Sequence, residues 1–487
     1  MTLATARRST ALAVLVLSCV SAPRLDAQDV LARDGTLTHA QQLARSAYKE
    51  LVEINTVDSV GDVTRAARAM QRRFLAAGFP RRDVLVLVPP GHPDKGNLVV
   101  RYRARRGAPA AKPILLLAHL DVVAANRADW PRDPFTLREE GGFFLGRGTS
   151  DDKAMAAIFA ATLLLYHEAG WQPDRDIILA LTADEESETL NGVQWLLANH
   201  RPLIDAAYAI NEGGGGLLLG DRAAANMMNA TEKVYLDLTL TATNAGGHSS
   251  VPRADNAIYA LSAALGRLSS FQFPATLNVV TRGFFEQTAT IEPRTDIAAA
   301  MRRIAASGDA VDADAATILS RDPYFSALLR TTCVPTRLAG GHAYNALPQT
   351  ATANVNCRVM PSSTAEEVRA TLTRVVADTG VHVTFRGALT EKFGVVPTPI
   401  DPRLLAEATR LTHEMWGNIP VVPIMSTGAS DGRYLRAAGI PTFGVDGMFT
   451  VPGESNEHGR DEKLRVRAFY EGQAFLGQLV KAITTAH

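Results

Sequence analysis

The chain of 487 residues contains 46% hydrophobic and 21% charged side chains, and its 50 basic and 50 acidic residues give a formal net charge of zero. This composition is typical of a globular protein with two or three folding units. Without a net charge or a long run of one sign, the sequence lacks the electrostatic footprint of proteins that bind nucleic acid or anionic membranes. Neither partner is expected.

An export signal is predicted at residues 1–27. Arg7 and Arg8 precede the apolar stretch "ALAVLVLSCV", which is too short to span a bilayer and is followed by small residues. We expect cleavage after Ala27, and a lipoprotein signal ending at Cys19 is the alternative. Because no later apolar run is long enough for a transmembrane helix, we expect a periplasmic or secreted protein.

Strand and helix signals alternate between residues 98 and 232, within a first unit placed at residues 28–232. The predicted strands are "NLVVRYRA", "ILLLAHLD", "DIILALTADEE" and "AAYAINEGG", and the helices between them are "KAMAAIFAATLLLYHEAG" and "LNGVQWLLANH". Short apolar strands that alternate with helices are typical of a buried parallel sheet with helical crossovers. We therefore expect an α/β layered fold.

Polar residues follow three of these strands at their carboxyl ends. His119 and Asp121 end one strand, Asp184–Glu186 end the next, and Asn211 and Glu212 end a third. Open α/β sheets place their sites along this edge. The sequence thus predicts a functional site there.

A smaller α+β unit is predicted at residues 233–390, inserted into the first. The segment "KVYLDLTLTAT" alternates polar and apolar residues as a half-exposed antiparallel strand does, and the amphipathic helix "NAIYALSAALGRL" follows. We expect an irregular stretch to about residue 330, then two strands, the helix "TAEEVRATLTRVVADTG" and the strand "VHVTFRGAL". The α/β character resumes at residues 391–487, which close with a helix from Arg465.

Two cysteines remain after removal of the signal. Cys333 and Cys357 lie in strand-like segments whose midpoint is Asn345, so a hairpin would set them opposite each other. In an oxidising compartment they form either a disulfide or two buried thiols.

Several residue types suited to metal binding recur along the chain. They are His119, Asp151, the pair Glu185 and Glu186, Glu212, and His458. Each is weak evidence alone: Asp151 and Asp152 are equally suited to cap a helix, and "DEESE" to a solvated helix start. Metal sites need such carboxylates and imidazoles to converge from separate elements, so the combination carries more weight than its members.

The ordered motifs resemble a known family. They are "LAHLDVV", "GRGTSDDKA", "TADEE", "NEGGG", "GGHSSVP", "NALP", "CRVMP", "GASDGRY" and "HGRDE". The resemblance is to the di-zinc metallopeptidases that include aminoacylase-1, acetylornithine deacetylase, succinyl-diaminopimelate desuccinylase, glutamate carboxypeptidase and carboxypeptidase S, and it covers essentially the whole mature chain. It implies a three-layer α/β catalytic domain with an inserted α+β lid and dimerisation domain.

The resemblance also implies two zinc ions per subunit, with Co²⁺ or Mn²⁺ as substitutes. His119 and Glu212 would bind one zinc, Glu186 and His458 the other, and Asp151 would bridge both. In relatives the peptide bond after the bridging aspartate is cis, so the bond between Asp151 and the next residue is expected to be cis.

Three further residues receive catalytic roles from the resemblance. Asp121 would hydrogen-bond the His119 imidazole, and Glu185 would be the general base that accepts a proton from zinc-activated water. His248 would stabilise the oxyanion, and in dimeric relatives this histidine comes from the partner subunit. A homodimer through the inserted domain is therefore expected, although single-chain arrangements exist.

Substrate contacts are expected at Asn345, Arg358 and Gly428. A guanidinium such as that of Arg358 suits a substrate carboxylate. Alternatively, Asn345 is only a turn residue and Arg358 only a strand cation on the surface. The loop of Gly428, Ser430 and Asp431 departs from the usual Gly-Gly-Thr-Asp of the family.

Hydrolysis of an amide bond follows from this resemblance. Small peptides are the first expected substrates because "GRGTSDDK" and "GGHSSVP" look like the carboxypeptidase S and dipeptidase branch, and N-acyl amino acids are the alternative. A non-catalytic metal-dependent binding protein and a structural partner protein are remote alternatives. Intact Glu185 opposes the first of these, and the complete set of metal ligands is superfluous for the second.

Overall fold

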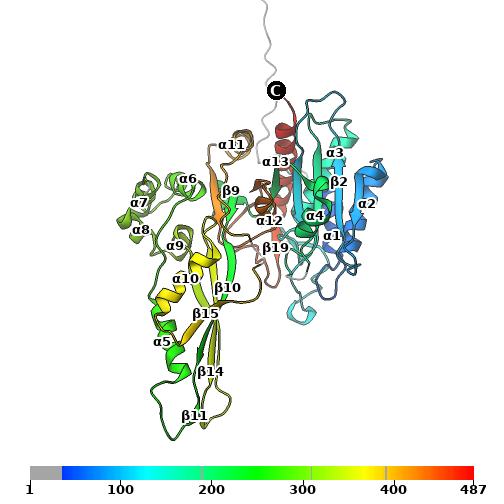
Figure 1. The fold of residues 1–487 in the computed structure, drawn as a ribbon. Coiled ribbons are helices and arrows are strands. Elements are labelled where there is room, and N and C mark those ends of the chain that lie inside the picture. The colour runs from blue at the N-terminus through cyan, green and yellow to red at the C-terminus, as the bar shows by residue number, and fades with distance from the viewer. Residues whose placement is uncertain (1–35, 188–189, 309, 390–391, 487) are drawn as a thin grey trace, which may run out of the picture.

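The computed structural model describes residues 36–187, 190–308, 310–389 and 392–486 (Figure 1). The predicted export signal, with Cys19 and Ala27, lies outside these residues. Within the described part of the chain, no helix has the length and apolarity needed to cross a bilayer.

The larger unit is built on a sheet of ten strands. Nine of them follow the order β1 (Val84–Leu87), β2 (Asn97–Tyr102), β6 (Ile177–Thr182), β3 (Ile114–His119), β7 (Tyr208–Asn211), β17 (Thr442–Gly444), β9 (Arg222–Glu232), β8 (Gly215–Leu219) and β18 (Phe449–Thr450), and β16 (Val421–Ser426) pairs with β9. The central pairs, β6 with β3, β3 with β7 and β7 with β17, are parallel. The predicted parallel core of the sheet is confirmed.

Helices cover both faces of this sheet. They are α1 (His39–Val52), α2 (Val63–Ala76), α3 (Lys153–Glu168), α4 (Gly192–Ile204), α11 (Pro402–Trp416), α12 (Gly432–Ala437) and α13 (Val466–Thr484). On β3, Leu116 points into the core shared with α1, α3 and α13, whereas Leu115 and Leu117 pack against α4 and α12. The strand is buried on both faces, as its continuous apolar sequence predicts.

The smaller unit is an antiparallel sheet with two helices on one face. Its strands follow the order β12 (Thr332–Gly340), β14 (Thr350–Val359), β10 (Val234–Thr243) and β15 (Val381–Phe385), and α5 (Ala257–Ser269) and α10 (Ala365–Val376) cover it. The short strands β11 (Gly247–His248) and β13 (Ala346–Leu347) pair beyond it. Figure 1 shows this unit extending away from the larger one, with β11 at its far end. The expected α/β fold with a smaller α+β unit is confirmed.

The two cysteines face each other across the edge of this smaller sheet. Cys333 of β12 is the register partner of Cys357 of β14, and a disulfide joins them. Of the two arrangements left open by the sequence, the structure has the disulfide.

The expectation of an irregular stretch up to residue 330 is wrong. Four helices occupy it: α6 (Val279–Thr288), α7 (Thr295–Ala305), α8 (Ala313–Leu319) and α9 (Pro323–Leu329). Asn278, Asp312 and Asp322 cap three of them with side-chain oxygens. Buried side chains such as Phe284 and Phe285 join the core of the larger sheet, where α6 packs beside β16. The domain boundaries at residues 232 and 391 stay predictions.

A small third sheet lies beside the larger unit. Its strands are β19 (Lys463–Arg465), β5 (Phe143–Leu145) and β4 (Arg138–Glu140). Two short 3-10 helices, η2 (Arg81–Asp83) and η3 (Arg127–Asp129), lie elsewhere in the chain. The pairing of β19 with β5 brings the C-terminal part of the chain against the segment that precedes Asp151.

Candidate metal centre

Three neighbouring strands deliver the first group of expected ligands to one edge. His119 is the last residue of β3, Glu185 and Glu186 follow β6, and Glu212 follows β7. These strands lie side by side and parallel, so their carboxyl ends meet. The predicted convergence at this edge is present.

Asp151 reaches the same place from the turn before α3. The peptide bond between Asp151 and Asp152 is cis, as expected. Although Asp152 occupies the N-cap position of α3, its side chain makes no capping hydrogen bond, so the capping interpretation of this acid pair is wrong.

The Asp151 carboxylate lies between two imidazoles. Its Oδ1 is 2.8 Å from Nε2 of His119, and its Oδ2 is 3.1 Å from Nε2 of His458. The two histidines come from segments that are separated by most of the chain. Each oxygen of one carboxylate thus faces a different histidine.

Three glutamates complete the cluster. The His119 Nε2 atom is 3.8 Å from Oε2 of Glu212, and the His458 Nε2 atom is 3.1 Å from Oε1 of Glu186. The ligand atoms of His119, Glu185 and Glu212 lie within 4.8 Å of one another, as do those of His119, Asp151 and Glu186. Six expected metal-site residues are therefore together, and imidazole and carboxylate donors suit a catalytic divalent metal.

Charge and burial strongly shift the ionisation of this cluster. Burial opposes ionisation of Asp151, but hydrogen bonds from His119 and His458 outweigh it and hold the Asp151 pKa well below its ordinary value. Burial, followed by the charge of Asp151, raises the pKa of Glu186 to about 8. Burial also raises the pKa of Glu185 well above its ordinary value. Acids crowded in this way resist ionising together, and a bound divalent cation relieves that resistance.

Asp121 holds the site differently from the expectation. The Nδ1 atom of His119 is 3.0 Å from the backbone carbonyl of Asp121, whereas the nearest carboxylate oxygen of Asp121 is 3.6 Å away. The carboxylate instead accepts the backbone N–H groups of Glu185 at 3.1 Å and Glu186 at 2.9 Å. Asp121 therefore orients both the imidazole and the turn that carries the two glutamates.

Lys95 supports the same turn, although sequence reasoning missed it. Asp184 adopts a left-handed conformation with φ of 59° just before Glu185. The buried Lys95 ammonium donates to its carboxylate at 2.6 Å and also binds Asp58. Asn191 donates to the Asp184 carbonyl at 3.2 Å. A left-handed non-glycine residue persists only where its surroundings hold it, and these contacts do so.

Glu462 is a second residue that sequence reasoning missed. Its buried carboxylate accepts the backbone N–H groups of Ser150 at 2.7 Å, Gly148 at 3.0 Å and Asp151 at 3.1 Å. It also pairs with the buried Arg147 at 2.6 Å. Because Glu462 lies four residues after His458 in "HGRDE", it ties the two segments that deliver ligands from opposite ends of the chain.

The loop of Gly428, Ser430 and Asp431 lies close to the cluster but is held by protein contacts. The Asp431 carboxylate accepts from Asn191 at 2.5 Å and from the Thr182 hydroxyl at 3.2 Å. Burial raises the Asp431 pKa to about 7. These bonds make Asp431 part of the scaffold around the end of β6.

Arg358 of β14 lies on the face of the smaller sheet opposite α5 and α10. Its guanidinium stands over the Tyr235 ring at 4.9 Å, and burial lowers its pKa. It forms no ion pair within 4 Å with a carboxylate of the described residues. The arginine is therefore free to bind an anion.

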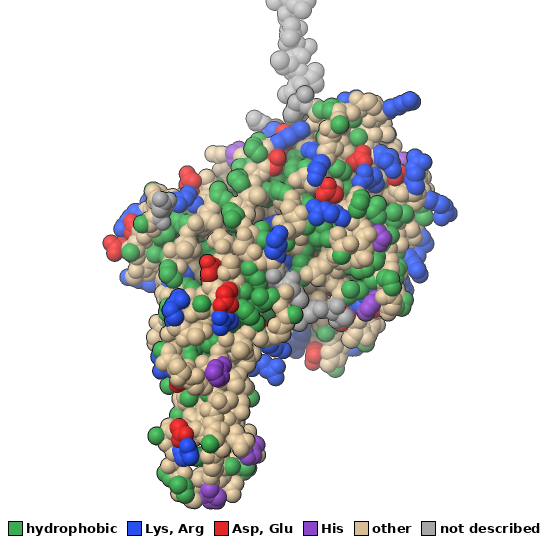
Figure 2. All heavy atoms as spheres, viewed as in Figure 1, with side chains coloured by type: hydrophobic (Ala, Val, Ile, Leu, Met, Phe, Trp, Pro, Cys, Tyr) green, Lys and Arg blue, Asp and Glu red, His purple; other side chains and the backbone are tan. Residues whose placement is uncertain are grey.

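His248 and Asn345 are not brought to the cluster. Both are exposed at the tip formed by β11 and β13, where the Ser249 N–H donates to the Asn345 carbonyl at 3.0 Å. Figure 2 shows this part of the molecule as a slender arm with histidine side chains gathered towards its end. Figure 1 shows β11 at the end of the smaller unit that points away from the larger unit, whose strands carry the ligands.

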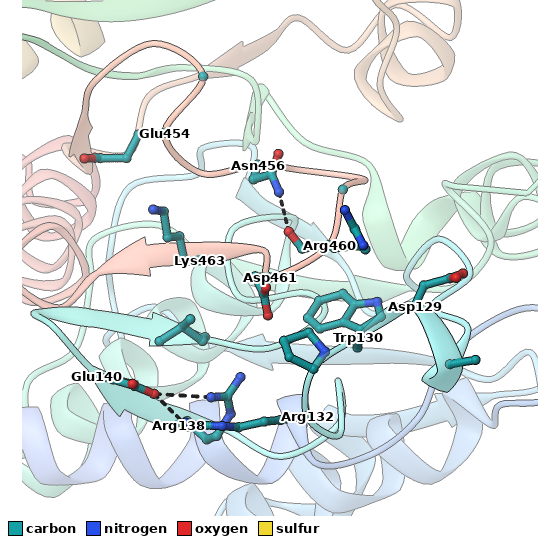
Figure 3. A pocket seen from close by; sticks show the side chains of 15 residues that line it. Asp129, Trp130, Arg132, Arg138, Glu140, Glu454, Asn456, Arg460, Asp461 and Lys463 are labelled. Carbon is teal, nitrogen blue, oxygen red and sulfur yellow. Dashed lines mark hydrogen bonds and ion pairs between the residues drawn. The ribbon is translucent and has the colours of Figure 1, made fainter.

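A cavity of about 1150 Å³ adjoins the loop that carries His458 (Figure 3). Its walls include Trp130, Arg138, Asn456 and Asp461, but none of the six clustered residues. Figure 3 shows Asp461 pointing from the loop into the cavity. The cavity is therefore a neighbour of the metal-ligand cluster.

Comparison with known proteins gives the chain its family. Residues 115–482 match the model of "Peptidase family M20/M25/M40". An N-fatty-acyl-amino acid synthase/hydrolase of Mus musculus is 29% identical over 77% of this chain and 75% of its own length. Aminoacylase-1A of Rattus norvegicus is 25% identical over 90% and 94%, respectively.

A solved structure shares the fold. The metallo-carboxypeptidase Sso-CP2 of Sulfolobus solfataricus superposes with a TM-score of 0.63 and 16% identity, over 90% of this chain and 98% of that one. The family match spans most of the chain and includes the first strand that carries a ligand as well as the C-terminal histidine loop. This protein therefore belongs to peptidase family M20/M25/M40, a family of metal-dependent hydrolases that act on amide bonds.

Proposed function

We propose that this protein is an exported di-zinc hydrolase that cleaves an amide bond in a small substrate with a free carboxylate. The observation that carries the proposal is the convergence of two histidines and four carboxylates, with Asp151 between the two imidazoles. A non-catalytic metal-binding protein would have no use for Glu185, which lies beside the ligands without being needed as one.

The donor set fits two zinc ions. Asp151 offers one oxygen towards the His119 and Glu212 pair and the other towards the His458 and Glu186 pair. Co²⁺ and Mn²⁺ accept the same donors and are substitutes. When bound, zinc would supply Lewis-acid activation of a water molecule and of the substrate carbonyl.

Glu185 is the proposed general base. Its carboxylate lies within 4.8 Å of ligand atoms of His119 and Glu212, beside the expected ligands of one zinc. Burial, which raises the Glu185 pKa, suits a group that accepts a proton from water and returns it to the leaving nitrogen near neutral pH. Asp121 holds the Glu185 backbone in place for this transfer.

Substrate binding is assigned to Arg358, and Gly428 is the weaker candidate. The guanidinium has no carboxylate partner among the described residues, and it is suited to a bidentate contact with a substrate carboxylate. This preference places the free carboxylate on the leaving amino acid.

His248 and Asn345 are proposed to serve the site of a second copy of the chain. Both lie at an exposed tip far from their own ligand cluster, so an active role requires delivery to another subunit (Figure 1). This supports a homodimer formed through the inserted unit. Sedimentation analysis of the mature chain is expected to show a dimer.

Two substrate classes remain, and each has a supporting observation. Motif similarity to the carboxypeptidase S and dipeptidase branch favours small peptides. The relative from Mus musculus favours N-acyl amino acids, because its name describes hydrolysis and synthesis of N-fatty-acyl amino acids. Both are linear amides that leave an amino acid with a free carboxylate.

The test combines metal analysis with two substrate panels. Purified wild-type protein is expected to contain two zinc ions per subunit and to hydrolyse members of a dipeptide or an N-acyl amino acid panel. Glu185→Gln should keep the metal and lose turnover by roughly 100-fold or more, the scale of general-base catalysis. Glu286→Gln, an exposed change on α6, is the matched control and should behave as wild type.

Two results would overturn the proposal. One is a metal-loaded wild type that hydrolyses nothing in either panel. The other is a Glu185→Gln variant that retains full turnover, because the base would then be another group. Export is tested separately by the mass of the secreted chain, which should begin after Ala27.

A further inference from the structure

A second cavity lies away from the metal-ligand cluster, between residues 272–275 and helix α8. Its volume is about 560 Å³, which is within the usual range of small-molecule sites. Arg330, which together with Thr331 links α9 to strand β12, also lines the cavity. It therefore lies where the four-helix segment α6–α9 meets the smaller sheet.

The lining of this cavity has two chemical characters. Phe273, Pro274 and Ala316 belong to an apolar wall. Among the described lining residues, the ionisable ones are Arg321 and Arg330, and both are cationic. A ligand that matches both parts carries one negative group on an apolar body.

Arg330 is the stronger anchor of the two arginines. It is only 7% exposed, and its side-chain partners, the Gln272 amide oxygen and the Ser320 hydroxyl, are neutral. Its Nε atom is buried without a hydrogen-bond partner in the described structure. Buried charges in proteins are normally paired, so this guanidinium lacks the anion that burial demands.

We propose that this cavity binds an amphipathic monocarboxylate, such as a medium-chain fatty acid anion. The carboxylate accepts from Arg330, with Arg321 at the exposed side, and the alkyl chain lies against the apolar wall. No residue of the metal-ligand cluster lines this cavity, so binding here does not depend on the proposed catalytic function.

The position of Arg330 connects this site to the passage between the two units. Its backbone carbonyl accepts from the Lys233 ammonium at 2.7 Å. Lys233 is fully buried between β9 and β10, and its backbone N–H donates to the Ser426 carbonyl of β16 at 3.0 Å. A ligand on Arg330 therefore stabilises the junction from which the lid extends.

Calorimetric titration of the metal-loaded mature protein tests the proposal, with octanoate, 1-octanol and acetate as probes. Octanoate should bind at least about tenfold more tightly than the other two, since it alone combines a charge-assisted hydrogen bond with burial of an alkyl chain. Octanoate should also raise the melting temperature.

Two variants remove the site in different ways. Arg330→Gln removes the charge, and Ala313→Trp fills the cavity from an exposed helix position while leaving the Arg330 bonds intact. Both should weaken octanoate binding by about tenfold or more. The matched control is Arg358→Met, which alters the proposed substrate contact and should leave octanoate binding unchanged.

Three outcomes would overturn the inference. The first is an octanoate affinity of Ala313→Trp equal to that of the wild type. This variant tests the site even if Arg330→Gln does not fold. The second is equal affinity for acetate or octanol. The third is loss of octanoate binding in Arg358→Met alone, which would place the anion in the catalytic site.

Discussion

Glu462→Gln is expected to disrupt the metal site without touching a proposed ligand. The native carboxylate accepts three backbone N–H groups of the loop around Asp151 and pairs with Arg147. A glutamine has the same shape, but it presents an NH₂ group where one carboxylate oxygen accepted hydrogen bonds. The substitution also leaves the buried guanidinium of Arg147 without its counter-charge.

The magnitude follows from these contacts. Removing one partner of a buried ion pair costs about 3–5 kcal/mol. Each backbone N–H left unpaired adds about 1–3 kcal/mol, offset in part by the one oxygen that remains on the side chain. We expect Glu462→Gln to lower the free energy of unfolding by at least about 3–5 kcal/mol, and to weaken metal binding by about 10- to 100-fold because Asp151 and His458 lose their common support.

Urea unfolding and competition with a metal chelator measure the two effects. The matched control is Glu457→Gln, five residues earlier in the same segment, whose exposed carboxylate accepts the Ser150 hydroxyl at 2.9 Å and no other hydrogen bond from the described residues. This control should change stability by less than about 1 kcal/mol. If Glu462→Gln keeps both its unfolding midpoint and its metal affinity, the assigned role of this carboxylate is refuted.

Two further changes test the lid and the junction. Reduction of the Cys333–Cys357 disulfide, which closes 24 residues, should lower stability by about 3 kcal/mol in urea unfolding, and a variant with alanine at both positions should not respond to reductant. Burial, followed by the charges of Arg358 and Arg330, lowers the pKa of Lys233 to about 7. Its value in the unfolded chain is about 10.4, so burial of the charged ammonium destabilises the folded protein most below pH 7. From pH 7 to 10 the unfolded state binds one more proton than the folded state, so the free energy of unfolding should rise by up to about 1.4 kcal/mol per pH unit relative to that of Lys233→Met. Parallel plots of unfolding free energy against pH for the wild type and Lys233→Met would contradict this.

The ligands on strand ends were accessible from the sequence because topology alone brings them together. A buried apolar strand that ends in His119, and others that lead to Glu186 and Glu212, predict one sheet edge. His458 had no such signal, because its loop lies beyond the last long strand and its role came from motif resemblance. The same holds for the pairing of this loop with Asp151.

The contacts of Asp121 could not be predicted from the sequence in atomic detail. Asp121 was expected to point its carboxylate at His119 as a neighbour on the same strand face, but β3 already ends at His119. The backbone carbonyl of Asp121 then meets the imidazole, and the carboxylate meets the next turn. A two-residue difference in where the strand ends thus changes which atom of Asp121 contacts the imidazole.

Helices α6–α9 were missed for a different reason. They contain 10, 11, 7 and 7 residues, so each offers few turns over which an apolar period could be recognised. Their capping residues, such as Asn278 and Asp322, were visible but equally common in turns. Their apolar faces are buried by strands and helices distant in the chain, and a local pattern does not record that partner.

The separation of Asp151 and His458 by 307 residues determines when the metal site can exist. One imidazole and three carboxylate ligands come from residues 119–212, whereas the second imidazole comes from a loop that follows the whole smaller unit in the chain. Contacts of such long range form late in folding, because loop closure must precede them. Full metal loading therefore requires that the C-terminal loop has folded onto the segments that supply the other ligands. A chain truncated before His458 should fail to retain the full metal content.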